Sequence, residues 1–187
     1  GSRGDKKGDF NGSFSRLLTR LDVKITDKRY GFLFQHPSEL DKYDALILII
    51  QQLIEFKGDD QGIKVIDFSE VPSEILPTII GLVARILYNV QFWTIKEERH
   101  PLALICDEAH LYLPKQTDNN PNEKRALENF EKIAKEGRKY GVSLVVISQR
   151  PSDVSETILS QCNNIMALRL SNKLDQNTVK SFMTDNL

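Results

Sequence analysis

The chain has 187 residues, of which 40% are hydrophobic and 27% charged, the composition of a globular protein large enough to bury a core. Its formal net charge of −1 excludes a chain-wide basic surface for nucleic acid, so any such contact would come from a local patch or from several subunits together. The two cysteines, Cys106 and Cys162, are too few for a disulfide framework, and no apolar run is as long as a membrane-spanning helix, so we expect a cytoplasmic protein with free thiols and no membrane contact.

The N-terminal part of the chain predicts one strand and one helix. Residues 1–14 are rich in glycine and lysine and begin with a Gly-Ser pair typical of a cloning remnant, so we expect a tag or a flexible segment there. Residues 29–34 bunch aromatic and apolar side chains, which predicts a strand. Ser38 is a good helix N-cap, and apolar residues at helical spacing predict a helix from there to about residue 56.

The middle of the chain predicts a turn, a strand and a long helix. Residues 58–62 carry the glycine and aspartate of a turn, and residues 63–68 predict a short strand. Residues 72–93 predict a helix that Pro77 either interrupts or starts. The apolar face of this helix is wide, which favours a buried core helix over one that packs on a neighbouring subunit. The face comprises Ile75, Ile79, Leu82, Val83, Ile86, Leu87 and Val90.

The C-terminal half alternates apolar strands with helices. We expect strands at residues 102–106, 142–147 and 165–170, and helices at residues 121–139, 155–161 and 175–182. The strands are apolar throughout, which is typical of a parallel sheet buried on both faces. The pattern predicts an α/β fold with a mainly parallel sheet flanked by helices, in one domain over residues 15–187.

Two acidic residues, Asp107 and Glu108, follow the first of these apolar strands. In open α/β sheets ligands bind beyond the carboxyl ends of the strands. An apolar strand followed by two acids is the Walker B pattern of ATPases, in which the first carboxylate reaches the Mg²⁺ shell of a nucleotide and the second activates a water beside the γ-phosphate. The alternative is an acid that only caps the following turn, and this motif alone leaves both interpretations open.

Two further groups of polar residues flank the next strand. Ser148 and Gln149 follow it, and an amide there either senses the γ-phosphate or is an exposed loop residue. Arg138 and Lys139 precede it, between two glycines at a helix end. They either complement the helix dipole or supply an arginine finger to a neighbouring subunit.

Taken together, three segments in this order resemble the HerA branch of the HerA/FtsK superfamily. They are residues 104–110 (Leu-Ile-Cys-Asp-Glu-Ala-His), 136–141 (Glu-Gly-Arg-Lys-Tyr-Gly) and 148–152 (Ser-Gln-Arg-Pro-Ser). Residues 65–72 and the tail from 159 to 175 resemble the same branch, so that the likeness extends over most of the chain.

The resemblance implies an incomplete RecA-like P-loop NTPase core in a hexameric homo-oligomer. It implies that ATP and Mg²⁺ drive translocation on double-stranded DNA, as a helicase working with a nuclease such as NurA or with another effector, in repair or antiphage defence. By the same resemblance Asp107 binds Mg²⁺, Glu108 is the catalytic base and Gln149 is the sensor. Arg138 is the preferred trans-acting finger, and Arg150, beside the nucleotide, is the second candidate.

Residues 107–110 also spell the DEAH box of a different helicase superfamily. Those helicases carry a Ser-Ala-Thr type motif after the next strand, where this chain has Ser-Gln-Arg-Pro at residues 148–151. The HerA interpretation is therefore favoured, with His110 as a turn or site-edge residue.

The phosphate loop G-x-x-x-x-G-K-[ST] of these motors is absent, since no glycine in the chain is followed by lysine. Without its backbone N–H groups and its lysine, the phosphates of a nucleotide have no cradle. We therefore expect a truncated motor that binds ATP weakly or not at all by itself.

Contacts to DNA are only weakly marked. Lys115, Lys124 and Arg125 follow the Walker B strand and predict either a pore loop in a ring or a solvated surface loop. Two other functions stay open: a non-catalytic module that supplies ring contacts and docks an effector, and a DNA pump of the FtsK or conjugation type. The segments 136–141 and 148–151 favour HerA over such pumps.

Overall fold

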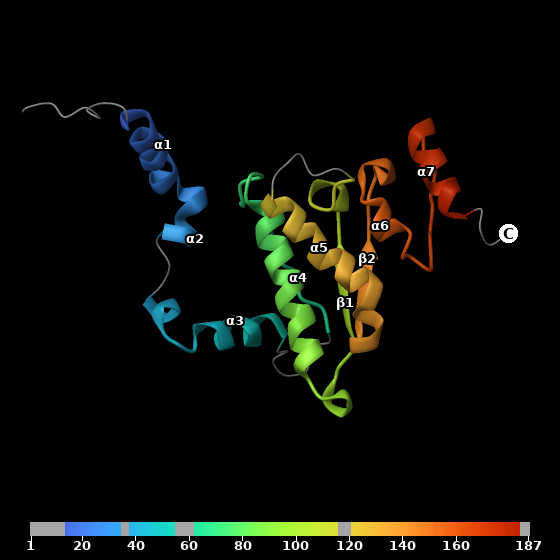
Figure 1. Ribbon diagram of the computed structural model, residues 1–187, viewed down its shortest axis with the longest axis horizontal. Helices are drawn as coiled ribbons and strands as arrows, with labels where there is room; N and C mark the ends of the chain where they lie inside the picture. Colours follow the sequence, from blue (N-terminus) through green and yellow to red (C-terminus); the bar gives the residue numbers. More distant parts are fainter. Residues whose placement is uncertain (1–13, 35–37, 55–61, 116–120, 184–187) are drawn as a thin grey trace, which may run out of the picture. The chain divides into compact units, whose positions relative to one another are not determined.

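The computed structural model describes residues 14–34, 38–54, 62–115 and 121–183. The chain divides into two compact units, one of residues 1–49 and 64–72 and the other of residues 50–63 and 73–187. Figure 1 shows the elements of each unit along the chain. The predicted N-terminal tag or flexible segment, except residue 14, and the predicted turn at 58–62, except Gly62, lie outside the described residues.

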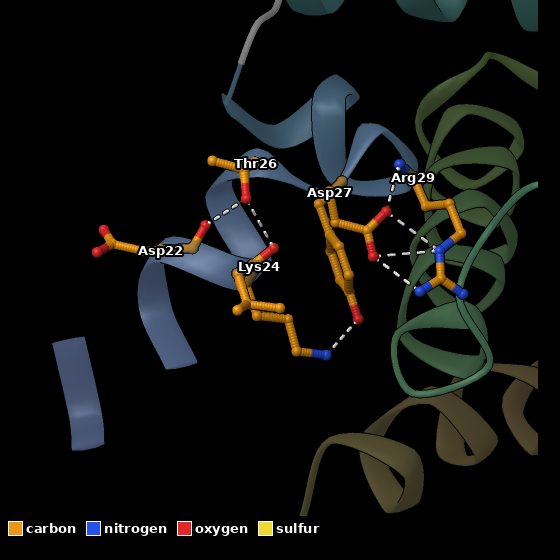
Figure 2. A network of polar contacts seen from close by, with 7 residues as sticks. Asp22, Lys24, Thr26, Asp27 and Arg29 are labelled. Atoms are coloured by element: carbon orange, nitrogen blue, oxygen red, sulfur yellow. Dashed lines mark hydrogen bonds and ion pairs between the residues drawn. The ribbon is translucent and has the colours of Figure 1, made fainter. Parts of the chain in front are cut away.

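The first unit consists of short helices. They are α1 (Ser15–Thr26), η1 (Lys28–Tyr30), α2 (Gly31–Phe34), η2 (Ser38–Asp41) and the first part of α3 (Ala45–Ile54). Asp27 lies between α1 and η1, and its carboxylate caps η1 by accepting the N–H of Arg29 at 3.0 Å. The guanidinium of Arg29 also binds both carboxylate oxygens, with Nη2 2.7 Å from Oδ2 (Figure 2). These hydrogen bonds lower the pKa of Asp27.

Three predictions for this region need correction. Residues 29–34 are helical rather than a strand, because the Asp27 cap satisfies a backbone N–H locally and starts a turn. The predicted helix from Ser38 is divided, since η2 and a turn precede α3, which begins only at Ala45. The strand predicted at residues 63–68 has no regular structure, and Val65 is 87% exposed. An extended segment becomes a strand only where another segment receives its hydrogen bonds, and in the described ranges none pairs with it.

The second unit is built on two helices that pack side by side, α4 (Leu76–Trp93) and α5 (Pro121–Glu136) (Figure 1). Pro77 lies in the first turn of α4, which confirms that it marks the start of the helix. The backbones approach closely at Gly81, where a Cβ atom would lie 2.6 Å from the Cβ of Ala126. Among the described helices none combines the length and the apolar composition that crossing a membrane requires.

The predicted apolar face of α4 is only partly buried. Leu87 is buried and Leu82 is 51% exposed, and the other five members of the face are half-buried. The buried side of α4 combines the small residues Gly81 and Ala84, which allow the two helix backbones to approach, with larger side chains. The buried residues of α4 are Pro77, Ile80, Gly81, Ala84, Leu87, Tyr88 and Gln91.

The strands β1 (Leu102–Cys106) and β2 (Val142–Val146) form a parallel pair, as predicted, with Leu102 opposite Val142 and Cys106 opposite Val146. The connection between them runs through η4 (Ala109–Leu111), α5 and η5 (Gly137–Tyr140), so that α5 is the crossover helix. The strands are not buried on both faces, since burial alternates along β1 and Ile105 is 61% exposed. The helices cover one face, and in the described part of the chain the other face is left to solvent.

The remaining elements are η3 (Lys96–Glu98), η6 (Pro151–Asp153), α6 (Glu156–Leu159) and α7 (Lys173–Met183), and the last two confirm the short and the final predicted helix. The third predicted strand, at residues 165–170, is wrong: the segment has no regular structure and Met166 is 92% exposed. Its apolar side chains suit a strand, but in the described part no neighbouring strand pairs with it. Buried Asp175 anchors α7 by accepting hydrogen bonds from the N–H and the hydroxyl of Ser152, at 3.1 and 2.7 Å.

Candidate functional site

The carboxyl end of β1 is a sharp turn made by Asp107 and Glu108. Glu108 has φ 48° and ψ 43°, a left-handed conformation that costs a residue with a side chain about 1–2 kcal/mol. It is the one non-glycine residue with positive φ in the described ranges. Asp107 stabilises the turn, because its Oδ1 accepts the N–H of Glu108 at 3.0 Å. The next N–H, of Ala109, donates to the carbonyl of Ile147 at 3.0 Å, which holds the turn beside the end of β2.

The carboxylate of Glu108 meets side chains from both strand ends. Gln149, which follows β2, donates from Nε2 to Oε1 at 2.7 Å. His110, in η4, has its Nδ1 3.4 Å from Oε2 and 3.3 Å from the hydroxyl oxygen of Ser148. Ser148 in turn accepts the N–H of Arg150 at 3.0 Å. One acid, one amide, one imidazole and one hydroxyl therefore meet at the edge of the sheet.

The site is open to a ligand at this edge. The side chain of Glu108 is 39% exposed, while that of His110 is 17% exposed. Asp107 and Gln149 are exposed. The two carboxylates can therefore be reached from solution, and neither is enclosed in a core ion pair.

Tyr112 supports the turn without adding charge. The hydroxyl of Tyr112 donates to the carbonyl of Asp107 at 2.7 Å. Burial raises the pKa of Tyr112, and burial raises the pKa of Cys106 to about 11. Both groups are therefore neutral near pH 7. Cys106 and Cys162 are free, as predicted.

The loops that follow the two strands are joined a second time beyond the site. Pro114 and Val154 form an antiparallel bridge, with the N–H of Ser155 donating to the carbonyl of Leu113 at 2.9 Å. Lys115 donates its N–H to the carbonyl of Asp153 at 2.8 Å. The loop of Glu108 and the loop of Gln149 are therefore fixed to one another at two places.

The comparison with known protein families identifies the same edge of the sheet. The model of the family described as "Helicase HerA-like C-terminal" matches residues 87–185, which contain the whole of the edge. This chain belongs to the HerA-like helicases. Relatives named HerA are similar to this chain beyond residues 87–185, in its N-terminal part as well.

Three HerA relatives illustrate the extent of the likeness, each named "DNA double-strand break repair helicase HerA". The protein of Sulfurisphaera tokodaii is 30% identical over 189 residues, covering 96% of this chain and 37% of that protein. The protein of Sulfolobus acidocaldarius is 34% identical over 129 residues, covering 67% and 25%. The protein of Pyrococcus furiosus is 44% identical over 80 residues, covering 43% and 14%. The chain thus spans well under half the length of these HerA relatives.

The residues predicted for a HerA site fall at opposite edges of the sheet. Asp107, Glu108 and Gln149 lie together at the carboxyl end. Arg138 lies in η5, before β2 begins, and is exposed. A five-residue strand such as β2 is about 16 Å long, so Arg138 does not reach Glu108 of its own chain. Its action on a neighbouring subunit stays a prediction.

The other predicted basic residues are not gathered into one patch. Arg150 stands next to Gln149, exposed, with Nη1 3.9 Å from a carboxylate oxygen of Asp153. Lys115 forms an ion pair with Glu156 of α6. Lys124 and Arg125 are exposed near the start of α5, and residues 116–120 of the loop lie outside the described residues.

The sequence predicts His110 only as a turn or site-edge residue and gives no role to Tyr112. Both positions depend on the left-handed conformation of Glu108, which turns the chain so that η4 lies against the carboxylate. Glycine, asparagine and aspartate are the usual residues in that conformation, so a glutamate gives no signal of it. The sequence feature that could have pointed to His110 is Ser148, because a hydroxyl at the end of the adjacent strand can contact a side chain in the turn after β1.

Proposed function

We propose that this chain is the C-terminal part of an ATP-driven motor that translocates double-stranded DNA. The observation that carries the proposal is the 2.7 Å hydrogen bond from Gln149 to Glu108, formed at the carboxyl end of adjacent parallel strands in a HerA-like helicase. That edge is where α/β proteins bind ligands.

In the proposed reaction Glu108 is the general base. It orients the attacking water and accepts its proton as the terminal phosphoryl group is transferred, a contribution of about 10²- to 10⁴-fold. Gln149 already contacts the carboxylate, so its amide is suited to report whether the γ-phosphate is present. Arg138 of a neighbouring subunit, or Arg150 of the same one, is proposed to stabilise the charge that develops.

Asp107 fits the role of the protein ligand of Mg²⁺. Its carboxylate is exposed at the site, and a hydrogen bond from the N–H of Glu108 orients it. In the described part of the chain no group of three metal-binding side chains forms a cage. This suits an ion that takes most of its ligands from nucleotide phosphates and water. When bound, Mg²⁺ would offset the negative charge of the phosphoryl oxygens.

The rest of the motor is proposed from the family. No glycine of the chain precedes a lysine, so we propose that a segment outside these 187 residues binds the phosphates and that the chain alone binds ATP weakly. The names of the relatives, repair helicases of double-strand breaks, support double-stranded DNA as the substrate. A hexameric ring, contact of Lys115, Lys124 and Arg125 with DNA, and a nuclease or defence effector as partner complete the proposal.

Replacement of Glu108 by glutamine in the full-length gene product tests the base. The amide keeps the shape and can still bind Gln149, but it cannot take a proton. We expect DNA-stimulated ATP hydrolysis to fall about 10²-fold or more, while binding of a fluorescent ATP analogue persists. The matched control is Glu97→Gln, an exposed residue of η3.

Wild-type hydrolysis by the Glu108→Gln protein would refute the catalytic role. Lost hydrolysis with unchanged DNA processing would instead support the module that only assembles rings and docks an effector. Sedimentation of the full-length protein with double-stranded DNA and ATP tests the ring, and a monomer under all conditions would refute it.

A further inference from the structure

The imidazole of His110 lies between the acid of β1 and the hydroxyl that follows β2. Its Nδ1 atom is 3.4 Å from Oε2 of Glu108 and 3.3 Å from Oγ of Ser148. The other carboxylate oxygen, Oε1, is bound by Gln149. Oε2 is buried and accepts no hydrogen bond in the described part of the chain, although Nδ1 of His110 lies 3.4 Å away.

The unsatisfied oxygen of Glu108 favours a proton on Nδ1 of the imidazole. A buried carboxylate oxygen without a donor is unfavourable. If Nδ1 were unprotonated, its lone pair would face that oxygen. The hydroxyl of Ser148 accepts the N–H of Arg150 and can rotate its own proton, so it is compatible with Nδ1 as a donor as well as with Nδ1 as an acceptor. A proton on Nδ1 would give Oε2 of Glu108 the donor that it lacks, with only a small movement of the ring or the carboxylate.

We propose that His110 is a positioning residue, which holds the carboxylate of Glu108 through an Nδ1–H donor so that it faces the reacting water. The proposal rests on the proposed function of Glu108. The side chain of Glu108 is half-exposed on a left-handed turn, and Gln149 is the hydrogen-bond partner of its carboxylate in the described part of the chain. When Gln149 turns to a phosphate, His110 keeps the carboxylate in place.

Two amide variants separate a donor at Nδ1 from mere filling of space. In His110→Asn the amide nitrogen can occupy the place of Nδ1, whereas in His110→Gln it reaches the place of Nε2 instead. His110→Phe keeps the ring and removes every donor. In the full-length gene product we expect the Gln and Phe variants to lose about 10- to 100-fold in kcat, as for outer-shell partners of metal-site ligands, with KM for ATP within about twofold. The Asn variant should keep at least a third of the wild-type kcat.

The opposite order is the result that would overturn the proposal. If His110 only fills space, the Phe variant keeps its activity and the Asn variant loses it. Wild-type kcat in both Phe and Gln variants would overturn it as well. His100→Phe and His100→Asn, at the exposed residue before β1, are the matched controls, and thermal unfolding of each variant monitors the fold. Should the Phe variant not fold, the contrast between Asn and Gln decides alone.

Glu108→Gln, measured beside these variants, separates failure of the proposed function from failure of the role of His110. Retained hydrolysis in that protein refutes the proposed function itself. Lost hydrolysis there, together with wild-type kcat in the Phe and Gln variants at position 110, refutes only the role of His110.

Discussion

Gly137→Ala should destabilise the fold, although Gly137 lies in a helical segment, as the first residue of η5 directly after α5. A Cβ there would lie 2.5 Å from the carbonyl oxygen of Val142, where ordinary contacts start at 3.4 Å, so the backbone would have to move by about 0.9 Å (3.4 − 2.5). The atom struck belongs to the first residue of β2 and cannot rotate away, which places the overpacking at about 3 kcal/mol, the upper end of its usual range. Alanine regains at most about 1 kcal/mol of helix propensity. The net loss of about 2 kcal/mol should lower Tm by about 4–8 °C.

Thermal unfolding followed by far-ultraviolet circular dichroism measures this loss, with Gly141 as the control. Gly141 has φ +75° but its Cβ would meet nothing closer than 3.8 Å, so Gly141→Ala should cost only about 1 kcal/mol of backbone strain. Gly141→Asn should melt near the wild type, because asparagine tolerates the left-handed region. A Gly137→Ala protein that melts at or above the wild type would show that the helix end does not approach β2 so closely.

Three further outcomes are expected. Gly81→Ala should lower Tm, since its Cβ would lie 2.6 Å from Cβ and 2.7 Å from Cα of Ala126, and adding Ala126→Gly should fail to restore Tm because the clash with the backbone of residue 126 remains. In urea unfolding Asp175→Ala should cost about 1–3 kcal/mol, because it removes the acceptor of the Ser152 N–H and the nearer acceptor of the Ser152 hydroxyl, which keeps only the 3.5 Å contact with Asp153. An unchanged midpoint would refute the anchor of α7. Burial raises the pKa of Cys106 from 9.0 to about 11, which keeps its thiol protonated at pH 8. In a variant without Cys162, a disulfide reagent at pH 8 should therefore label Cys106 about 100-fold more slowly in the native chain than in the unfolded chain. Equal labelling rates would contradict this.

The parts of the fold that depend on local pattern could be predicted from the sequence. The strands β1 and β2, the start of α4 at Pro77 and the final helix follow from apolar runs, proline and periodicity, and the structure agrees within a few residues. The strands predicted at 63–68 and 165–170 fail for a common reason. Apolar composition supplies side chains for a sheet, but pairing depends on a partner segment that composition does not reveal.

The candidate site likewise has a part that the sequence predicts and a part that it does not. Asp107, Glu108 and Gln149 could be expected at one edge, because parallel neighbouring strands end on the same side. The contact between His110 and Glu108 could not, because it follows from a backbone conformation that is unusual for glutamate. The face of α4 could be predicted only in part, because bulky residues indicate the core side of a helix but do not reveal that Gly81 is the point of close approach to α5.

At position 108, thermal stability and the proposed catalysis favour different residues, because the left-handed backbone is strained for glutamate whereas the proposed reaction needs its carboxylate. Glycine or asparagine would adopt φ 48° with less strain, so either should make the folded chain more stable by about 1 kcal/mol. A selection for heat tolerance alone would thus favour variants that have discarded the carboxylate. Engineering libraries built on this scaffold should keep codon 108 constant and seek their gains elsewhere.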